Sequence, residues 1–156
     1  MNRQNKNKKD IKYILNHLRE VDKLECIDTE GEDYKKTLFQ KIYERDCIIG
    51  KYKNKAVIMG GVFAVDDNNT DIGCAWMLST DEIVNHKLSL MKHLKIILEE
   101  LDKKYFILCN YMHNLNIENC KYLERLGFVF GDIDGIPKRD NYTFFYRINP
   151  KMKGLN

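Results

Sequence analysis

The chain has 156 residues, and its 26 lysines and arginines against 23 acidic residues give a formal net charge of +3. With 44% apolar, 11% aromatic and 31% charged residues, the composition excludes a disordered chain and is sufficient for one domain with a buried core. No apolar run reaches the roughly 18 residues that a membrane-spanning helix needs, so we expect no membrane partner.

The first nine residues are polar and basic, and no apolar secretion segment follows them. Their lysines and arginine account for the excess of positive charge, so a nucleic-acid partner is not expected. We predict a flexible basic tail over 1–9, a single domain over 10–150 and a second tail over 151–156.

The five cysteines form no CxxC motif and no Cys/His cluster. This pattern favours reduced thiols and a cytoplasmic location over disulfides or structural zinc. Cys74 and Cys109 lie in apolar stretches, which predicts buried thiols. His86 and His93 are seven residues apart without an acidic third ligand, so no metal site is expected.

The first half of the chain predicts two helices and then three strands. Apolar residues recur at helical spacing over 10–24 and again over 33–45, and the polar residues 28–31 separate the two segments. β-branched and aromatic residues then predict three antiparallel strands. The strands are expected at 47–52, 56–65 and 72–78.

Ser79 and Glu82 have the spacing of a capping box, so a long helix is expected to start at Ser79. An apolar stripe at helical spacing carries this helix to about residue 103. The stripe consists of Val84, Leu88, Met91, Leu94, Leu98 and Leu101.

The last third of the chain predicts three strands and one helix. A strand at 105–109 precedes a helix over 116–126, which Gly127 closes as a C-terminal cap. Strands at 128–130 and 143–148 follow. The order ααβββαβαββ predicts the α+β class, with a mixed, mostly antiparallel sheet and helices on both faces.

This order of elements resembles the GNAT superfamily of acyl-CoA N-acyltransferases, and the likeness is sharpest from Asn116 to Phe128. Members of that family open their fourth helix with an asparagine and follow the helix with a Gly-Phe pair, at the spacing that Asn116 and Gly127 have here. The resemblance covers the chain from about Ile11 to Ile148. It implies transfer of an acetyl group from acetyl-CoA to a primary amine of a small-molecule or protein acceptor.

The resemblance also implies where acetyl-CoA binds. In GNAT proteins the pantetheine arm lies between two splayed strands, here 72–78 and 105–111, and the pyrophosphate lies on amides that open the helix between them, here within 79–87. Carried over to this sequence, the cofactor-binding residues are Met77, Leu78, Ser79, Lys87, Asn116 and Asn119. For Asn116, a plain helix cap is an equal alternative.

The turn at 79–87 departs from the family pattern in two ways. GNAT proteins have Gln/Arg-x-x-Gly-x-Gly/Ala there, whose glycines let the backbone close around phosphates, whereas no glycine occurs between Gly73 and Gly127 here. Asp81 and Glu82 also place negative charge where the pyrophosphate would lie. The capping box is an alternative use of the same amides.

Catalysis in this family needs a base for the amine and often an acid for the CoA thiolate. His113 and Tyr111, which follow the strand at its carboxyl end, are the expected base positions, and Cys109 is a weaker one. Many GNAT enzymes have a tyrosine four residues before the glycine that acts as the general acid for the CoA thiolate. In this sequence Leu123 occupies that position. Tyr122 lies one residue earlier, where its side chain is rotated by about 100° around the helix axis. A solvated loop histidine and a partly buried helix tyrosine are the alternatives for His113 and Tyr122.

A narrower resemblance implies a different function. The stretch from Gly73 to Asp81 is similar to one in phage GNAT-like proteins, a group that includes internal virion protein A-like proteins. It implies a catalytically silent GNAT-fold protein that is a virion or host-interaction component, with a phage or host protein partner and a location in the virion or the host cytoplasm. The sequence therefore leaves open whether the protein is an enzyme.

Overall fold

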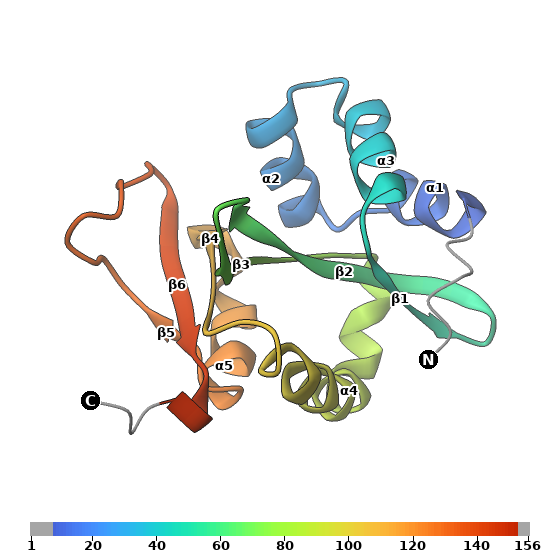
Figure 1. The fold of residues 1–156 in the computed structure, drawn as a ribbon. Helices are drawn as coiled ribbons and strands as arrows, with labels where there is room; N and C mark the ends of the chain where they lie inside the picture. Colours follow the sequence, from blue (N-terminus) through green and yellow to red (C-terminus); the bar gives the residue numbers. More distant parts are fainter. Residues whose placement is uncertain (1–7, 153–156) are drawn as a thin grey trace. The chain divides into compact units, whose positions relative to one another are not determined.

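The structure is a computed structural model that describes residues 8–152, except for three side chains, those of Asn69, Ile117 and Glu118. Within that range, the chain has five α-helices and one six-stranded sheet with the strand order β1-β2-β3-β4-β6-β5 (Figure 1). The strands are β1 (Ile48–Tyr52), β2 (Lys55–Asp66), β3 (Asn69–Ser79), β4 (Ile107–His113), β5 (Val129–Phe130) and β6 (Tyr142–Ile148). This confirms the α+β class, with one helix more than the sequence predicts.

The sheet is mixed, as predicted. β1 pairs antiparallel with β2, and β6 pairs antiparallel with both β4 and β5. β3 pairs with β4 in parallel. No helix of the described chain is long and apolar enough to span a membrane.

The chain divides into two compact units. Unit 1 consists of the residues up to Val62 together with Trp76–His86. Unit 2 consists of Phe63–Ala75 together with the residues from Lys87 on.

The helices of unit 1 are α1 (Lys8–Asn16), α2 (Glu20–Glu30) and α3 (Tyr34–Glu44), and α3 packs against the other two. The sequence predicts one helix over 10–24 where α1 and the first part of α2 stand, and this prediction is wrong. The chain leaves the helix because Leu18 forms a β-bridge with Thr80 and the Arg19 amide donates to the Ser79 carbonyl at 3.0 Å. Hydrogen bonds to a distant strand thus override the local periodicity.

The ends of these helices differ from the expected bounds. α1 already includes Lys8 and Lys9, which the sequence assigns to the tail, and residues 1–7 of that tail lie outside the described residues. α2 continues through the expected separator at 28–31 and ends at Gly31, whose φ of 83° favours glycine. At the other end of the chain, a 3-10 helix covers Pro150–Met152, and the rest of the predicted tail is not described.

Unit 1 has its own apolar core between these helices and the hairpin of β1 and β2. Ile11, Ile14 and Met59 are completely buried in it. The other buried members of the cluster are Leu15, Cys26, Tyr34, Ile42, Ala56 and Leu78. The apolar face predicted for the first helix is therefore the face that packs.

Burial raises the pKa of the Cys26 thiol to about 12, and the carboxylates of Asp22, Glu25 and Glu30 add to the effect. Between the ordinary thiol pKa of 9.0 and this value, the folded protein keeps a proton that the unfolded chain has lost. The free energy of unfolding should therefore fall as the pH rises above 9. We expect the stability difference between the wild-type protein and Cys26→Ala, measured by urea unfolding, to narrow by about 1 kcal/mol from pH 8 to pH 10. A pH-independent difference would contradict this assignment.

The expected capping box at Ser79 is wrong. Ser79 is the last residue of β3, and a 3-10 helix, η1 (Asp81–His86), separates it from α4 (Lys87–Leu101). The apolar stripe predicted for one long helix is buried only at Leu98. Val84 and Leu88 are exposed, and the other three stripe residues are half-buried. The serine hydroxyl is held by a tertiary contact instead of capping a helix.

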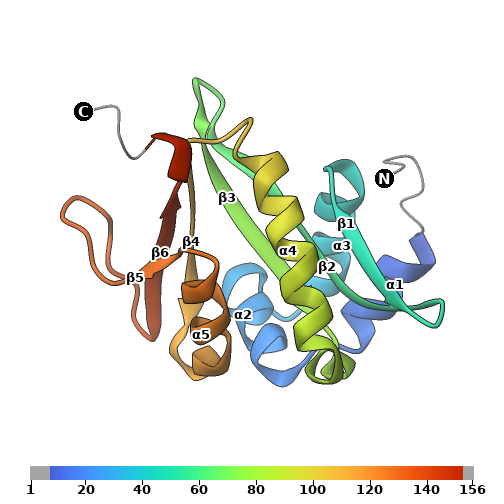
Figure 2. The same cartoon turned by 90° about the horizontal axis from the view of Figure 1, so that it is seen from below.

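In unit 2, α5 (Ile117–Arg125) packs against β5 and lies beside β4 (Figure 2). The Sγ atom of Cys120 on α5 lies 3.7 Å from the sulfur of Met112 on β4, and the Leu126 carbonyl accepts a hydrogen bond from Arg147 on β6. Gly127 follows the helix with a φ of 89°, as the predicted C-terminal cap requires.

Candidate functional site

In unit 1, the end of β3 is held by a buried carboxylate that the sequence does not mark. Oδ2 of Asp22 accepts hydrogen bonds from the Ser79 amide at 2.9 Å and from the Ser79 hydroxyl at 3.0 Å. Arg19 donates to the same carboxylate through two nitrogens, at 2.9 and 3.2 Å. Asp22 and Ser79 are only 3% and 5% exposed. Both donors of Ser79 are therefore engaged within the protein.

This arrangement bears on whether the turn after β3 fits a pyrophosphate. The next amide, that of Thr80, donates to the Val57 carbonyl at 2.9 Å, and the Ile83 amide donates to the Thr80 carbonyl at 3.1 Å. Asp81 and Glu82 add two carboxylates at this turn. The amides of Ser79, Thr80 and Ile83 are thus used by the protein, and this part of the turn does not fit a phosphate cradle.

The other strand residues assigned to the cofactor differ in burial. Leu78 is 9% exposed and its side chain belongs to the core of unit 1, so only its backbone is left for a ligand. Met77 is half-buried. Trp76, one residue earlier, packs against the core and lies close to Gly61, where a Cβ atom would come within 3.2 Å of the indole nitrogen.

In unit 2, the parallel ladder between β3 and β4 has three residue pairs, and Cys74 opposite Cys109 is the last of them. One residue further along β4, a side chain provides the hydrogen bond between the two strands. Nδ2 of Asn110 donates to the Ala75 carbonyl of β3 at 2.7 Å. Asn110 Oδ1 also accepts a hydrogen bond from the Tyr111 amide. Asn110 thus satisfies a strand carbonyl where the regular pairing stops, a role that no sequence motif indicates.

His113, the expected base, is the last residue of β4 and is 8% exposed. Its Nδ1 accepts a hydrogen bond from the Leu115 amide at 3.1 Å, and its ring lies edge-on to Tyr142, with centroids 5.0 Å apart. Because Nδ1 accepts, a neutral ring carries its proton on Nε2. His113 is therefore a positioned, buried histidine and not the solvated loop residue that is the alternative reading.

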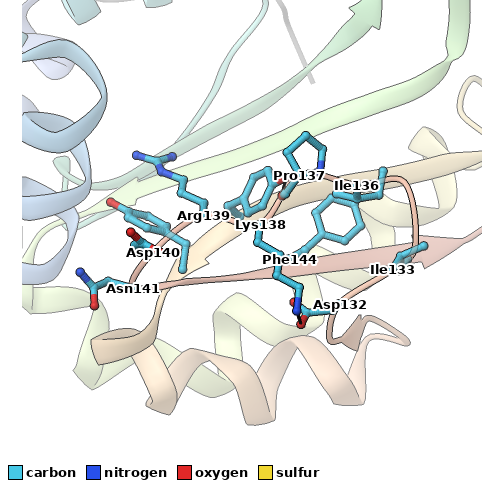
Figure 3. Close-up of a pocket in the computed structure, with 11 residues that line it drawn as sticks. Asp132, Ile133, Ile136, Pro137, Lys138, Arg139, Asp140, Asn141 and Phe144 are labelled. Carbon is cyan, nitrogen blue, oxygen red and sulfur yellow. Dashed lines mark hydrogen bonds and ion pairs between the residues drawn. The ribbon is translucent and has the colours of Figure 1, made fainter.

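Tyr111, the second expected base, lies on the same face of β4 as His113. Its hydroxyl donates to the Pro137 carbonyl at 2.5 Å, and its ring lies edge-on to Phe144. It lines a pocket of about 260 Å³, whose other lining residues are Asp132, Ile133, residues 136–142 and Phe144 (Figure 3). Tyr111 thus lines a pocket, and its hydroxyl hydrogen points to the Pro137 carbonyl in the loop between β5 and β6.

Tyr122, the expected acid, is half-buried on α5. Lys87 Nζ lies 5.3 Å from the centre of its ring, and the Arg125 guanidinium lies 6.0 Å from it. Two cations therefore flank this phenol. Leu123, at the family's tyrosine position, has no proton to donate.

Asn116 precedes α5 and is 7% exposed, but its side chain makes no capping hydrogen bond to the helix. The helix-cap alternative for this residue is therefore not seen. Asn119 is half-buried on the same helix.

Cys109, the weaker base candidate, is poorly suited to act as a base or nucleophile in this structure. Cys74 and Cys109 are half-buried, so their thiols are less buried than the apolar stretches around them predict. Burial still raises the pKa of the Cys109 thiol, which disfavours its thiolate at neutral pH. No group of three or more metal-ligating side chains occurs among the described residues.

Comparisons with known proteins identify the fold. No protein-family model matches the sequence, and a sequence search finds no curated relative. A ribosomal-protein-alanine N-acetyltransferase from Brucella melitensis is similar in structure, with a TM-score of 0.62 and 11% sequence identity over 91% of this chain and 96% of that one.

Two further structures belong to acetyltransferases of the GNAT family. The one from Streptococcus pneumoniae has a TM-score of 0.57 and 14% identity over 90% of this chain and 94% of its own. The one from Elizabethkingia anophelis, solved with acetyl-CoA bound, has a TM-score of 0.54 and 12% identity over 79% of this chain and 87% of its own. The chain therefore has the fold of the GNAT-family acetyltransferases.

Proposed function

We propose that the protein is an N-acetyltransferase that moves an acetyl group from acetyl-CoA to a primary amine. The observation that carries this proposal is the fold, which matches GNAT acetyltransferases over nine-tenths of the chain in two of the comparisons above. One of the similar structures contains acetyl-CoA. Acetyl-CoA would supply the acetyl group as a thioester.

The strand pair β3 and β4 supports the proposal from within unit 2. Its parallel ladder stops after Cys74 and Cys109, and Asn110 takes up the Ala75 carbonyl by its side chain. The strands thus lose regular pairing near the candidate catalytic residues of β4. This is the feature that the family resemblance associates with the pantetheine arm.

Of the candidate bases, His113 has the better chemistry for accepting the proton of an amine. Its ring is held by Leu115 and Tyr142, so its orientation is fixed. With its hydrogen on Nε2, the neutral ring would have to release the Leu115 amide from Nδ1 before it accepts a further proton, because Nδ1 is its one basic nitrogen. Tyr111 is a weaker base, because its hydroxyl already donates to Pro137. Tyr122, flanked by Lys87 and Arg125, remains the proposed acid.

A catalytically silent protein with this fold, in a virion or host-interaction role, is the second candidate. The observation that favours it is the engagement of the Ser79 donors by Asp22, since these are donors that a pyrophosphate at this turn would use. The acidic residues Asp81 and Glu82 point the same way. The remaining cofactor candidates, Lys87, Asn116 and Asn119, belong to unit 2 and do not depend on that contact.

An acetyl-transfer assay separates the two candidates. The protein is incubated with acetyl-CoA and a panel of amines, namely a monoamine, a polyamine and a lysine-containing peptide, and free CoA thiol and acetylated amine are measured together. We expect amine-dependent CoA release, lowered by about 100-fold or more in His113→Ala if this residue is the base. Full turnover of that variant would remove His113 from the mechanism, and absence of transfer to every amine would favour the silent protein.

A further inference from the structure

The pocket beside Tyr111 is the strongest feature of unit 2 that the proposed catalytic residues do not explain. Its volume is about 260 Å³, slightly below the usual range for small-molecule sites, so it has room for a small ligand only. The loop between β5 and β6, residues 131–141, forms most of its wall, and Tyr111, Tyr142 and Phe144 of the sheet form the rest.

The loop is fastened to the sheet at several points, so the pocket is preformed. The Gly131 amide donates to the Phe144 carbonyl at 3.0 Å, and the Asn141 carbonyl accepts from the Asn114 amide at 2.8 Å. Between these ends, the Pro137 carbonyl accepts the hydroxyl proton of Tyr111. A ligand would therefore meet a shape that is already in place, with little ordering cost.

One end of the pocket is apolar. Ile136 and Pro137 lie beside the ring of Phe144 in Figure 3, with Ile133 next to them. Ile133 and Ile136 are each 37% exposed, which is high for isoleucine on a tethered loop. Such a surface favours the apolar or aromatic part of a ligand.

The charged residues of the pocket balance one another. Asp132 is already paired with Lys138 at 2.8 Å, and the Arg139 guanidinium lies 3.8 Å from the centre of the Tyr142 ring. Asp140 has no ion-pair or hydrogen-bond partner among the described residues, and it lies with Arg139 away from the apolar end (Figure 3). Asp140 is thus available to the positive charge of a ligand, whereas the other carboxylate of the lining, Asp132, is already neutralised by Lys138.

We propose that this pocket binds the acceptor as a primary monoamine with an apolar or aromatic body. The body packs against Phe144 and Ile136, and the ammonium group lies beside Asp140. The role of the ligand as acceptor rests on the proposed acetyl transfer, but its binding does not. The pocket would therefore give a polyamine no advantage over a monoamine, because Asp132, the second carboxylate of the lining, is already paired with Lys138.

The test is a titration of the full chain with 2-phenylethylamine in the absence of acetyl-CoA. Binding is measured by calorimetry or from NMR chemical-shift changes. Two other probes each change one property: 2-phenylethanol lacks the charge, and spermidine lacks the aromatic body and has more charge. We expect 2-phenylethylamine to bind about fivefold or more tightly than either one. Equal binding of 2-phenylethanol, tighter binding of spermidine, or binding of inorganic phosphate in place of the amine would overturn the proposal.

Variants locate the binding. Asp140→Asn keeps the shape of the pocket and should weaken 2-phenylethylamine about three- to fivefold, and Phe144→Leu should do the same by removing the aromatic face. Asp134→Asn in the same loop and Val129→Ala on β5 change exposed residues that do not line the pocket, and they should leave binding unchanged. An Asp140→Asn protein that binds like Asp134→Asn would overturn the proposal.

The outcome also distinguishes this proposal from the proposed function. Binding of 2-phenylethylamine without acetyl transfer to it would leave the pocket in place and count against the enzyme. Acetyl transfer at an unchanged rate in both Asp140→Asn and Phe144→Leu would support the enzyme and overturn the pocket as its acceptor site.

Discussion

Replacing Asp102 by asparagine is expected to lower the free energy of unfolding by about 3 to 5 kcal/mol, because it leaves the buried charge of Arg147 without its partner. The guanidinium donates to both carboxylate oxygens of Asp102, at 2.5 and 3.0 Å, and both side chains are 8% exposed. Arg147 also donates to the Leu126 carbonyl at the end of α5. One pair therefore joins α4, α5 and β6 within unit 2.

Glu100→Gln is the matched control for Asp102→Asn. Glu100 pairs with Lys103 at 2.6 Å close to the same helix end, but their side chains are 67% and 63% exposed. Its loss should cost about 0.5 kcal/mol or less. Urea unfolding of the two variants measures the contrast, and equal losses in both would contradict the buried-pair account. A double variant, Asp102→Leu with Arg147→Met, should recover part of the loss because no unpaired charge remains.

Asp22→Ala is expected to have an effect of similar size in unit 1, about 3 to 5 kcal/mol by urea unfolding. The change leaves Arg19 without its carboxylate and the buried Ser79 amide without an acceptor. It should also loosen the junction between α2 and the end of β3, since the Asp22 carboxylate is the group that these donors share.

Two variants calibrate this result. Ser79→Ala removes only the hydroxyl and keeps the amide contact, so it should cost about 1 kcal/mol. Asp28→Ala, at an exposed position of the same helix, should cost about 0.5 kcal/mol or less. If Asp22→Ala were no more destabilised than Asp28→Ala, the buried cluster would not be holding the end of β3.

The sequence predicts those parts of the fold that depend on local pattern. The helix α3, the helix α5 with its closing Gly127, and the six strands all follow from apolar periodicity and turn-forming residues, within a few positions of their bounds. In α3 the pattern also marks two residues that are buried, Tyr34 and Ile42, so residues close together along the chain carry much of the information for this element. The α+β class follows from their order.

The failures have a common cause in contacts between residues far apart in the chain. The helix expected over 10–24 is interrupted because Leu18 and Arg19 bond to Thr80 and Ser79. The capping box expected at Ser79 is absent because Asp22 takes the serine hydroxyl. Neither partner is visible from local spacing, and both errors arise at the same junction.

The candidate site shows the same division. The sequence predicts His113 and Tyr111 as base candidates just after a strand; the structure places both within the last three residues of β4, and their catalytic role stays a prediction. Asn110 belongs to no sequence motif. Its contact with the Ala75 carbonyl can be recognised only from the three-dimensional structure, because the two residues lie far apart in the chain. The pocket is missed because the loop over 131–141 has no recognisable pattern, and only its tethers to β4 and β6 give it a shape.

Thermal unfolding with and without acetyl-CoA tests the central claim, that this GNAT fold binds the acetyl donor, most directly. At a concentration of 100 times the dissociation constant, binding to the folded state should add about 2.7 kcal/mol to the stability and raise Tm by about 5 to 10 °C. ATP at the same concentration is the matched control and should leave Tm nearly unchanged. A rise in Tm with acetyl-CoA but not with ATP is the predicted result. An unchanged Tm at millimolar acetyl-CoA would contradict acetyl-donor binding and with it the proposed enzyme.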